Sequence, residues 1–283
     1  MRSNLTYETT DPASGNEEGK HLPVLPLPTL KDAQLLGWDA AISKSKGIYG
    51  FDSLDARSRP FNMIRAKLHE LRAQRGWRLF GIVSATPKVG KSFIAANVAA
   101  SLSRDPRFST TAIDLDLRRA SLTAIFNIEP RTSIRAYLEE QRGADVPTAY
   151  ALEGERLVIL PTSPGPIRSA ELLAGNRAHA LFRAMHNAGD HSLFVVDLPP
   201  VFANDDAVTA MARLDAYVVV VEEGRTTTRE VKDVISLLGV QRLAGVVLNK
   251  YRGGLVSEGY GVDNYYAAGY YSGRHDEENA SAE

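Results

Sequence analysis

The sequence predicts an α/β fold, a mostly parallel, doubly wound sheet flanked by helices. Short β-branched runs alternate along the chain with longer stretches of helical periodicity. The runs are apolar throughout, which indicates strands buried on both faces, and such strands need helices on either side of the sheet. Ligands of these folds bind at the carboxyl ends of the strands, so the residues that follow each run are the candidate site.

Six runs are predicted strands, and they cover residues 79–84, 110–114, 156–160, 193–197, 216–222 and 244–249. Helical periodicity predicts helices over residues 92–104, 179–189 and 228–239. One more helix is expected before the first strand, because apolar residues recur at helical spacing from Phe61 to Leu71. The globular domain is therefore expected to start near Pro60.

Three segments are expected along the chain. Residues 1–58 are predicted to be a disordered, Pro-rich extension, residues 59–250 a catalytic domain, and residues 251–283 a flexible, Tyr-rich tail. The prolines of "LPVLPLPTL" favour an extended path, which suits a stiff spacer or a docking peptide. The N-terminus lacks the apolar core of a signal peptide.

Composition narrows the class of protein. Lys and Arg number 33 against 34 Asp and Glu, so no global charge favours a nucleic-acid partner, and none is expected. There are no cysteines, which excludes disulfides, thiolate metal sites and cysteine nucleophiles, and fits a bacterial cytosol. The longest apolar runs, such as "AYVVVV", fall far short of the roughly 20 residues that cross a bilayer.

The first predicted strand ends in "SATPKVGKS", Ser84 to Ser92, and an Ala-rich helix follows. This is close to the phosphate-binding pattern G-x-x-x-x-G-K-[ST], with Ala85 in place of the first glycine. The fold class is therefore a P-loop NTPase, in which Lys91 reaches the phosphates and Ser92 can ligate Mg²⁺. The alternative is that this segment is a chance turn before a helix and binds no phosphate. The predicted nucleotide-binding residues are Ala85, Thr86, Pro87, Lys88, Val89, Gly90, Lys91, Ser92 and Phe93.

Carboxylates follow two other predicted strands. "AIDLDLRR" contains Asp114 and Asp116, and "FVVDLPP" ends a strand at Asp197. Carboxylates at the tips of neighbouring strands would face the crevice that holds the phosphates, where Mg²⁺ takes oxygen ligands. Ser92, Asp114 and Asp197 are therefore the predicted metal site. The alternative for each aspartate alone is a helix cap.

Together, "SATPKVGKS", "AIDLDLRR" and "FVVDLPP" resemble the Walker A, A′ and B motifs of the bacterial tyrosine kinases of capsule and exopolysaccharide export. Further similarity lies in "IRSAELLAG", "NDDAV", "RTTTREV" and "GVVLNK", so the resemblance covers roughly residues 60–271. It implies ATP and Mg²⁺ as cofactors. It also implies that Asn249 reads adenine, although a strand-ending turn residue is the alternative. The implied catalytic residues are Lys91, Asp114, Asp116 and Asp197.

Six of the eleven tyrosines fall between Tyr251 and Tyr271, among Gly, Ala, Ser and Asn, without strand or helix periodicity. Packing does not explain them, which leaves an adhesive low-complexity tail or a use for the phenolic hydroxyls. The resemblance implies autophosphorylation of this tail. The implied sites are Tyr260, Tyr265, Tyr266, Tyr270 and Tyr271.

The resemblance further implies a cytoplasmic autokinase that a membrane chain-length determinant (polysaccharide co-polymerase) recruits to the inner face of the membrane. It also implies a homo-oligomer and a phosphotyrosine phosphatase as partners. The sequence departs from the family at Lys88, where glycine is usual, and in the helical E-x-x-R-x-x-R motif, of which only Arg65 remains.

Two alternatives stay open. The first is an ATP-switched assembly or positioning ATPase without protein kinase activity, although Thr86 replaces its signature lysine and Pro87 matches the kinases. The second is a nucleotide-binding scaffold that has lost catalysis, which the departures at Lys88 and in the helix motif would explain.

Overall fold

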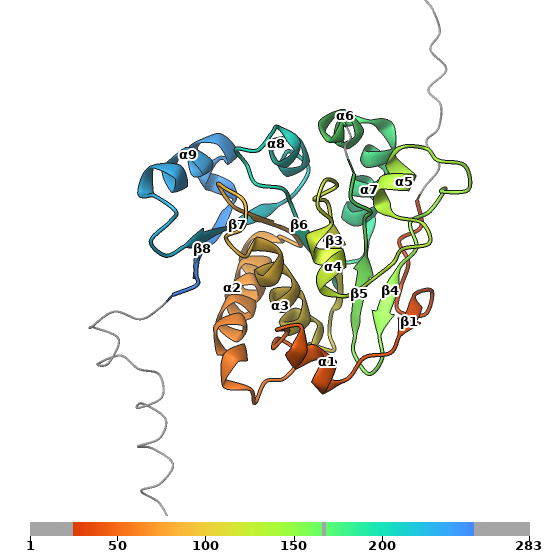
Figure 1. Cartoon of the computed structure of the whole chain (residues 1–283), viewed down its shortest axis with the longest axis horizontal. Coiled ribbons are helices and arrows are strands. Elements are labelled where there is room, and N and C mark those ends of the chain that lie inside the picture. Colours follow the sequence, from red (N-terminus) through yellow and green to blue (C-terminus); the bar gives the residue numbers. More distant parts are fainter. Residues whose placement is uncertain (1–24, 166–167, 252–283) are drawn as a thin grey trace, which may run out of the picture.

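The computed structural model describes residues 25–165 and 168–251. In this part of the chain, eight strands form one sheet in the order β1-β4-β5-β3-β6-β2-β7-β8 (Figure 1). They are β1 (Gln34–Leu36), β2 (Leu79–Val83), β3 (Ser109–Asp114), β4 (Tyr150–Leu152), β5 (Leu157–Leu160), β6 (Ser192–Asp197), β7 (Ala216–Glu222) and β8 (Leu243–Asn249). All neighbours are parallel except β4 and β5. The predicted mostly parallel, doubly wound sheet is confirmed.

Helices cover both faces of the sheet, with α2 and α3 together on one side and α7, α8 and α9 on the other (Figure 1). The helices are α1 (Ala40–Ser45), α2 (Arg59–Arg75), α3 (Lys91–Ser103), α4 (Ser121–Ile125), α5 (Ile134–Leu138), α6 (Ser169–Ala174), α7 (Asn176–Asn187), α8 (Asp206–Met211) and α9 (Thr228–Leu238), with the 3-10 turns η1 (Ala56–Ser58) and η2 (Val240–Arg242). The helix expected near Phe61 is α2, and the three expected after the first strand are α3, α7 and α9.

The sheet separates two apolar cores. On β2, Phe80 and Ile82 pack toward α2 and α3, whereas Leu79 and Val83 pack toward the opposite helices. All four side chains are fully buried. A strand that is covered on both faces explains why the sequence shows a continuous apolar run and no alternation.

The sheet extends beyond the predicted strands at one edge. β1 pairs in parallel with β4, with Gln34 opposite Tyr150, and Trp38 and Ile48 of the next segment are buried. The expected disordered extension is therefore wrong for residues 34–58, while residues 1–24 lie outside the described residues. β1 and β4 are three residues long, which is too short for a periodic pattern in the sequence.

Asn97 of α3 fixes this N-terminal part of the fold. Its side-chain oxygen accepts hydrogen bonds from the backbone N–H groups of Tyr49 (2.7 Å) and Gly50 (3.1 Å). Its amide donates to the carbonyl oxygens of Gly47 and Phe93, both at 3.0 Å. Gly50 lies so close that a Cβ there would be 2.2 Å from the carbonyl oxygen of Asn97. The segment before α2 is thus held against the helix that follows the phosphate loop.

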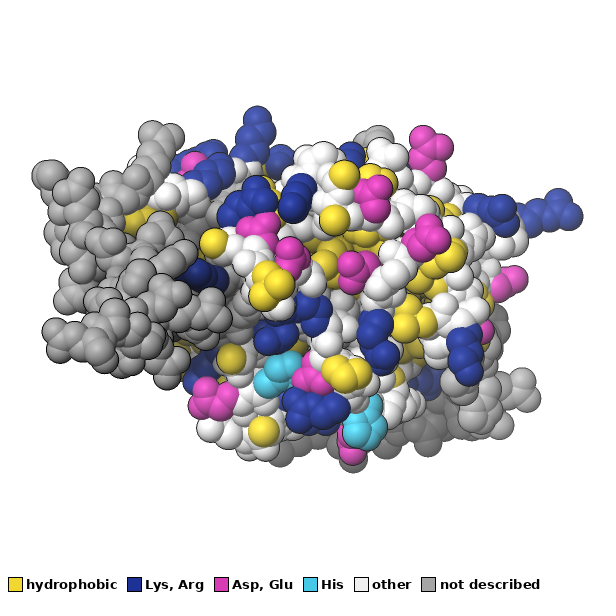
Figure 2. Space-filling model, turned by 90° about the horizontal axis from the view of Figure 1, so that it is seen from below, with side chains coloured by type: hydrophobic (Ala, Val, Ile, Leu, Met, Phe, Trp, Pro, Cys, Tyr) yellow, Lys and Arg dark blue, Asp and Glu magenta, His cyan; other side chains and the backbone are white. Residues whose placement is uncertain are grey.

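Within the described ranges, no helix combines the length and the apolar character needed to span a bilayer. The face shown in Figure 2 carries Lys and Arg side chains interspersed with Asp and Glu, with apolar side chains between them. Mixed charge on this face agrees with the near-balanced composition of the chain.

Candidate functional site

The phosphate loop connects β2 to α3. Helix α3 begins at Lys91, after Gly90, whose φ of 91° lies in the left-handed region. Gly90 also has no room for a side chain, because a Cβ would lie 2.1 Å from Nδ2 of Asn249. A glycine is therefore required where the loop enters the helix, and the N-terminus of α3 presents its first backbone N–H groups to the loop.

Lys88 adopts the conformation of a glycine. Its φ is 67°, in a region that costs an ordinary residue roughly 1–2 kcal/mol. The carbonyl oxygen of Lys88 accepts a hydrogen bond from Nζ of Lys250 at 2.7 Å, and that ammonium also lies 3.1 Å from Oε1 of Glu222. The departure from the family pattern thus falls on a strained position that the end of β8 helps to hold.

Two of the predicted carboxylates lie side by side. Asp114 ends β3, Asp197 ends β6, and the two residues are direct partners in the register of these neighbouring strands. Both side chains are fully buried, and Asp116, two residues after β3, is 3% exposed. The sequence prediction that these three residues share one edge of the sheet is therefore consistent with the geometry.

Lys91 forms a buried ion pair with Asp197. Its Nζ lies 2.5 Å from Oδ1 of Asp197 and 3.9 Å from Oδ2 of Asp116. Burial raises the pKa of Asp197, and the ammonium of Lys91 opposes that rise. Oδ2 of Asp197 is buried and has no hydrogen-bond partner among the described residues. One oxygen of this carboxylate is thus engaged by Lys91, and the other has no protein partner in the described part of the chain.

Asp114 is held by its own loop. Its Oδ1 accepts from the backbone N–H of Asp116 (3.1 Å), and its Oδ2 accepts from the N–H and the hydroxyl of Thr123, both at 2.8 Å. Burial, and then the charge of Asp197, raise the pKa of Asp114 to about 7. Because both oxygens have protein donors, Asp114 is better placed to orient Asp116 than to contact a metal directly.

A cavity of about 230 Å³ lies over the phosphate loop. It is lined by Ser84, Pro87, Lys88, Gly90, Lys91, Ser92, Phe93, Asp116, Arg119, Ser121 and Pro200. Arg119 and Ser121 were not among the predicted site residues, although Arg119 ends the motif "AIDLDLRR" and Ser121 lies two residues after it. Of the predicted loop residues, Ala85 and Val89 are buried behind the cavity.

Asn249 contacts the phosphate loop. Its side-chain amide donates a hydrogen bond to the carbonyl oxygen of Val89 at 2.8 Å. Together with the bond from Lys250 to Lys88, this contact attaches the last strand to the loop at two successive positions. The predicted tyrosines Tyr260, Tyr265, Tyr266, Tyr270 and Tyr271 lie outside the described residues.

Ser169 of "IRSAELLAG" and Asp206 of "NDDAV" are distant in the sequence, but they lie in contact beside this edge of the sheet. The hydroxyl of Ser169 donates to Oδ2 of Asp206 at 2.5 Å, and Asn204 donates to the same oxygen at 2.8 Å. Nε of Arg118 in turn donates to Ser169 at 3.1 Å. Asp206 is almost fully buried, so this network fixes the segment that follows Asp116.

The remnant of the helical E-x-x-R-x-x-R motif faces its own chain. Arg65 donates to the carbonyl oxygen of Ser101 on α3 at 3.4 Å, and the amide oxygen of Asn62 accepts hydrogen bonds from Ser101 and Arg104. Asn62 and Arg65 are therefore both engaged in hydrogen bonds within one subunit.

The donor set suits a magnesium nucleotide. No group of three or more His, Cys, Asp or Glu residues gathers as a metal site in the described ranges. Mg²⁺ in nucleotide enzymes instead uses one or two carboxylates, a hydroxyl, phosphate oxygens and water. Ser92 and Lys91 line the cavity, and Asp197, whose Oδ1 pairs with Lys91, lies behind them with its Oδ2 unpartnered among the described residues. These residues therefore fit Mg²⁺ bound with a nucleotide.

Fold and site together define a P-loop nucleotide-binding protein. The chain belongs to the family of the CobQ/CobB/MinD/ParA nucleotide binding domain, whose model matches residues 80–262. The predicted P-loop NTPase class is thereby confirmed.

Individual relatives connect the chain to tyrosine kinases. It is 36% identical over 179 residues to the succinoglycan biosynthesis transport protein ExoP of Rhizobium meliloti, covering 61% of this chain and 22% of ExoP. It is 26% identical over 188 residues to the tyrosine-protein kinase ptk of Acinetobacter johnsonii, covering 66% of this chain and 25% of that kinase. The chain thus spans about a quarter of the length of these relatives. The predicted resemblance to bacterial tyrosine kinases is confirmed.

Among solved structures, the chimerical protein CapA2B2 has the same fold. The TM-score is 0.65 at 24% sequence identity, and the match covers 81% of this chain and 96% of that chain.

Proposed function

We propose that this protein is an ATP-dependent protein-tyrosine autokinase that phosphorylates its own C-terminal tail and regulates exopolysaccharide or capsule polymerisation and export. The observation that supports this most directly is the position of the tail. Lys250, which bonds to the phosphate loop at Lys88, is followed at once by Tyr251 and the Tyr-rich segment. The tail therefore begins beside the site that would supply the phosphoryl group.

Each residue of the site has a proposed role. Lys91 and the N-terminus of α3 bind the phosphates, while Ser92 and Asp197 hold the cation. ATP and Mg²⁺, when bound, supply the transferable γ-phosphoryl group and neutralise its charge. Asp114 orients Asp116 through its backbone N–H, and Asp116 lines the cavity. Asp116 would accept the phenolic proton as the tyrosine oxygen bonds to the γ-phosphorus, the bond to the β-phosphate breaks, and ADP leaves. A base is needed because a tyrosine hydroxyl has a pKa of about 10.

The names of two relatives support a kinase in polysaccharide biosynthesis and transport, and we propose partners that suit such a kinase. ExoP is by name a biosynthesis transport protein, and ptk a tyrosine-protein kinase. We propose that a membrane chain-length determinant recruits this protein to the inner face of the cytoplasmic membrane, and that a phosphotyrosine phosphatase reverses the reaction. Phosphorylation between subunits requires a neighbour, and Asn62 and Arg65 are already engaged within the subunit. A partner that holds subunits close would raise their effective concentration.

The central test replaces Tyr260, Tyr265, Tyr266, Tyr270 and Tyr271 with Phe in the full chain. Phosphotyrosine, measured by intact mass before and after phosphatase treatment, should be mostly lost, while ATP hydrolysis should continue. Tyr49→Phe is the matched control, since Tyr49 lies in the N-terminal part of the fold, and it should leave both signals unchanged.

The outcomes separate the competing functions. Undiminished phosphotyrosine would remove the proposed role of the tail. ATP hydrolysis without any phosphotyrosine in the unaltered protein would favour a positioning ATPase, and the absence of both activities would favour a scaffold.

Partner dependence is tested by a dilution series of autophosphorylation, with and without a cytoplasmic peptide of the chain-length determinant. If the autophosphorylation rate per molecule changes neither on dilution nor on addition of the peptide, partner-driven phosphorylation is excluded.

A further inference from the structure

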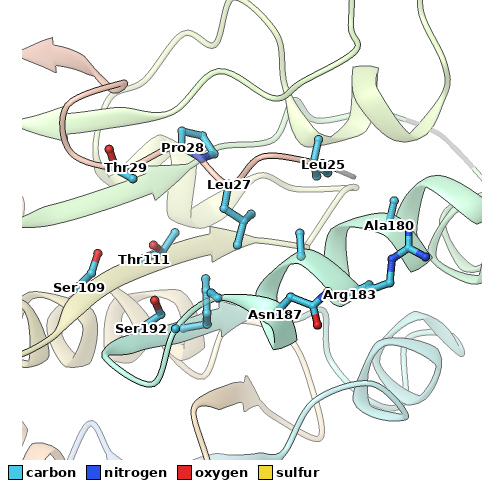
Figure 3. Close-up of a pocket in the computed structure, with 14 residues that line it drawn as sticks. Leu25, Leu27, Pro28, Thr29, Ser109, Thr111, Ala180, Arg183, Asn187 and Ser192 are labelled. Carbon is cyan, nitrogen blue, oxygen red and sulfur yellow. The ribbon is translucent and has the colours of Figure 1, made fainter. Parts of the chain in front are cut away.

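A second cavity lies far from the phosphate loop. It has a volume of about 370 Å³ and opens between the first described residues, the starts of β3 and β6, and helix α7 (Figure 3). Ser109 and Ser192 begin these two strands as direct register partners, and Asp114 and Asp197 end them. At roughly 3.3 Å per residue, the two ends are about 16 Å apart, so the cavity is separate from the nucleotide site.

The floor of this cavity is unusually polar. Strands of a parallel sheet that are covered on both faces normally present apolar side chains. Here Ser109, Thr111 and Ser192 place three hydroxyls on the face that α7 covers, and Figure 3 shows them gathered at one end of the cavity. Thr111 is only 8% exposed. Thr111 is thus a polar side chain at a buried position, while Ser109 and Ser192 lie at the more open starts of their strands.

These polar groups lack protein partners. In the described part of the chain, no hydrogen bond engages the hydroxyls of Ser109, Thr111 and Ser192 or the side-chain amide of Asn187, which also lines the cavity. Thr111 is buried, whereas Ser192 is half-buried and Ser109 and Asn187 are exposed, so these groups lie from the floor to the mouth of the cavity. Their hydrogen-bonding capacity is therefore open to a molecule that enters the cavity.

The rest of the lining indicates the chemistry of that molecule. Leu27 and Phe194 provide apolar walls, and no acidic residue lines the cavity. The guanidinium of Arg183 lies at the end away from Ser109 and Ser192 (Figure 3). Hydroxyls and an amide beside apolar walls suit a ligand that is neutral, rich in hydroxyls and apolar on one face. The volume falls within the roughly 300–1,000 Å³ typical of small-molecule sites.

We propose that this cavity binds a neutral polyhydroxylated small molecule, of the size of a monosaccharide. Its hydroxyls exchange hydrogen bonds with Ser109, Thr111 and Ser192, and its C–H face packs on Leu27 and Phe194. This site is independent of the proposed kinase activity, because it shares no residue with the nucleotide cavity.

The test is a titration of the full chain with glucose, galactose and myo-inositol, followed through the backbone amide resonances. At least one of the three should cause saturable shifts at Thr111 and Ser192 and none at Gly90 or Lys91. If none of the three causes saturable shifts at Thr111 and Ser192, the proposal is wrong.

Thr111→Val preserves the shape of the side chain and removes its hydroxyl. It should weaken binding of the responding sugar by about tenfold, which corresponds to the loss of one well-formed hydrogen bond. Ser192→Ala provides a second variant with the same expectation. Thr110→Val is the matched control, because Thr110 is also buried and its hydroxyl also lacks a partner, but it does not line the cavity. Equal weakening by Thr110→Val would overturn the proposal.

Discussion

The side-chain amide of Asn249 donates a hydrogen bond to the carbonyl oxygen of Val89 over 2.8 Å. This bond joins the end of the last strand to the phosphate loop. Asn249 was expected from the sequence resemblance to read adenine, and the contact gives it a second, structural task. The two tasks can be separated, because the loop serves every nucleotide whereas adenine reading serves only ATP.

Asn249→Ala should therefore weaken ATP and GTP binding by about the same factor, near fivefold, the equivalent of one hydrogen bond of about 1 kcal/mol. Calorimetric titration with both magnesium nucleotides measures this. A loss confined to ATP would instead assign Asn249 to the base.

Lys88→Gly should raise the free energy of unfolding by about 0.5–1 kcal/mol, because glycine accepts the φ of 67° without strain. The same change should weaken nucleotide binding, since the Lys88 side chain lines the phosphate cavity. Chemical denaturation and titration measure the two effects. Glu140→Gly, at a φ of 54°, is the control and should give the stability gain alone. If Lys88→Gly destabilises the fold, the strain argument fails.

Lys91→Met should lower the free energy of unfolding without nucleotide by about 3–5 kcal/mol, because it leaves the buried charge of Asp197 unpaired. Adding Asp197→Asn should restore most of that loss, since the uncompensated charge is removed. Urea denaturation of the two single variants and the double variant tests the coupling. Strictly additive losses would mean that the pair is not formed in solution.

The pKa of Asp114 predicts a pH dependence of stability. A buried carboxyl whose pKa is raised to about 7 holds a proton in the folded state between about pH 4 and 7, where the unfolded chain has lost it. This group therefore makes stability fall as pH rises through that window. Asp197→Asn removes the neighbouring charge that contributes to the raised pKa, so the fall should become shallower. Urea denaturation at a series of pH values checks the slope, and an unchanged slope would contradict the coupling.

Asp116→Asn should reduce the rate of autophosphorylation by about 10²–10⁴, the range for loss of a general base, and leave ATP affinity within a few fold. The reason is that Asp116 lines the cavity but most ground-state binding comes from the loop. Single-turnover kinetics with a separate binding assay distinguishes the two quantities. A normal rate of autophosphorylation in this variant would mean that Asp116 is not the general base.

Much of this site could be predicted because its signals are local. The loop pattern and the strand-ending aspartates are short stretches in which residue type reports backbone geometry or charge. The glycine-like backbone of Lys88 is not reported by its residue type, and its φ of 67° is seen only in the structure. Thr123 could not be predicted in its role, because its contact with Asp114 depends on how α4 folds back over β3. The same holds for Lys250, whose bond to Lys88 joins positions that only the complete sheet brings together.

The secondary-structure elements likewise divide into those that the sequence predicted and those that it did not. Long buried strands and amphipathic helices were predicted, whereas β1 and β4 were not, since three-residue strands carry no periodic signal. Residues 34–58 looked like an extension because their anchoring includes contacts with one polar side chain of α3, Asn97, and an edge pairing, which position their buried residues Trp38 and Ile48. Neither feature is visible in the composition of the segment.

The pairing of β3 with β6 has a consequence for how the protein assembles. Asp114 and Asp197 belong to strands that are distant in sequence but adjacent in the sheet. Closing so long a loop carries an entropic cost that must be met before the pairing stabilises the chain, and such non-local contacts slow folding. The two carboxylates that end these strands beside the phosphate loop therefore meet only when most of the sheet has formed. A ribosome-bound chain that has not yet exposed β6 would display the phosphate loop without a working site, which delays any phosphoryl transfer until synthesis of the domain is nearly complete.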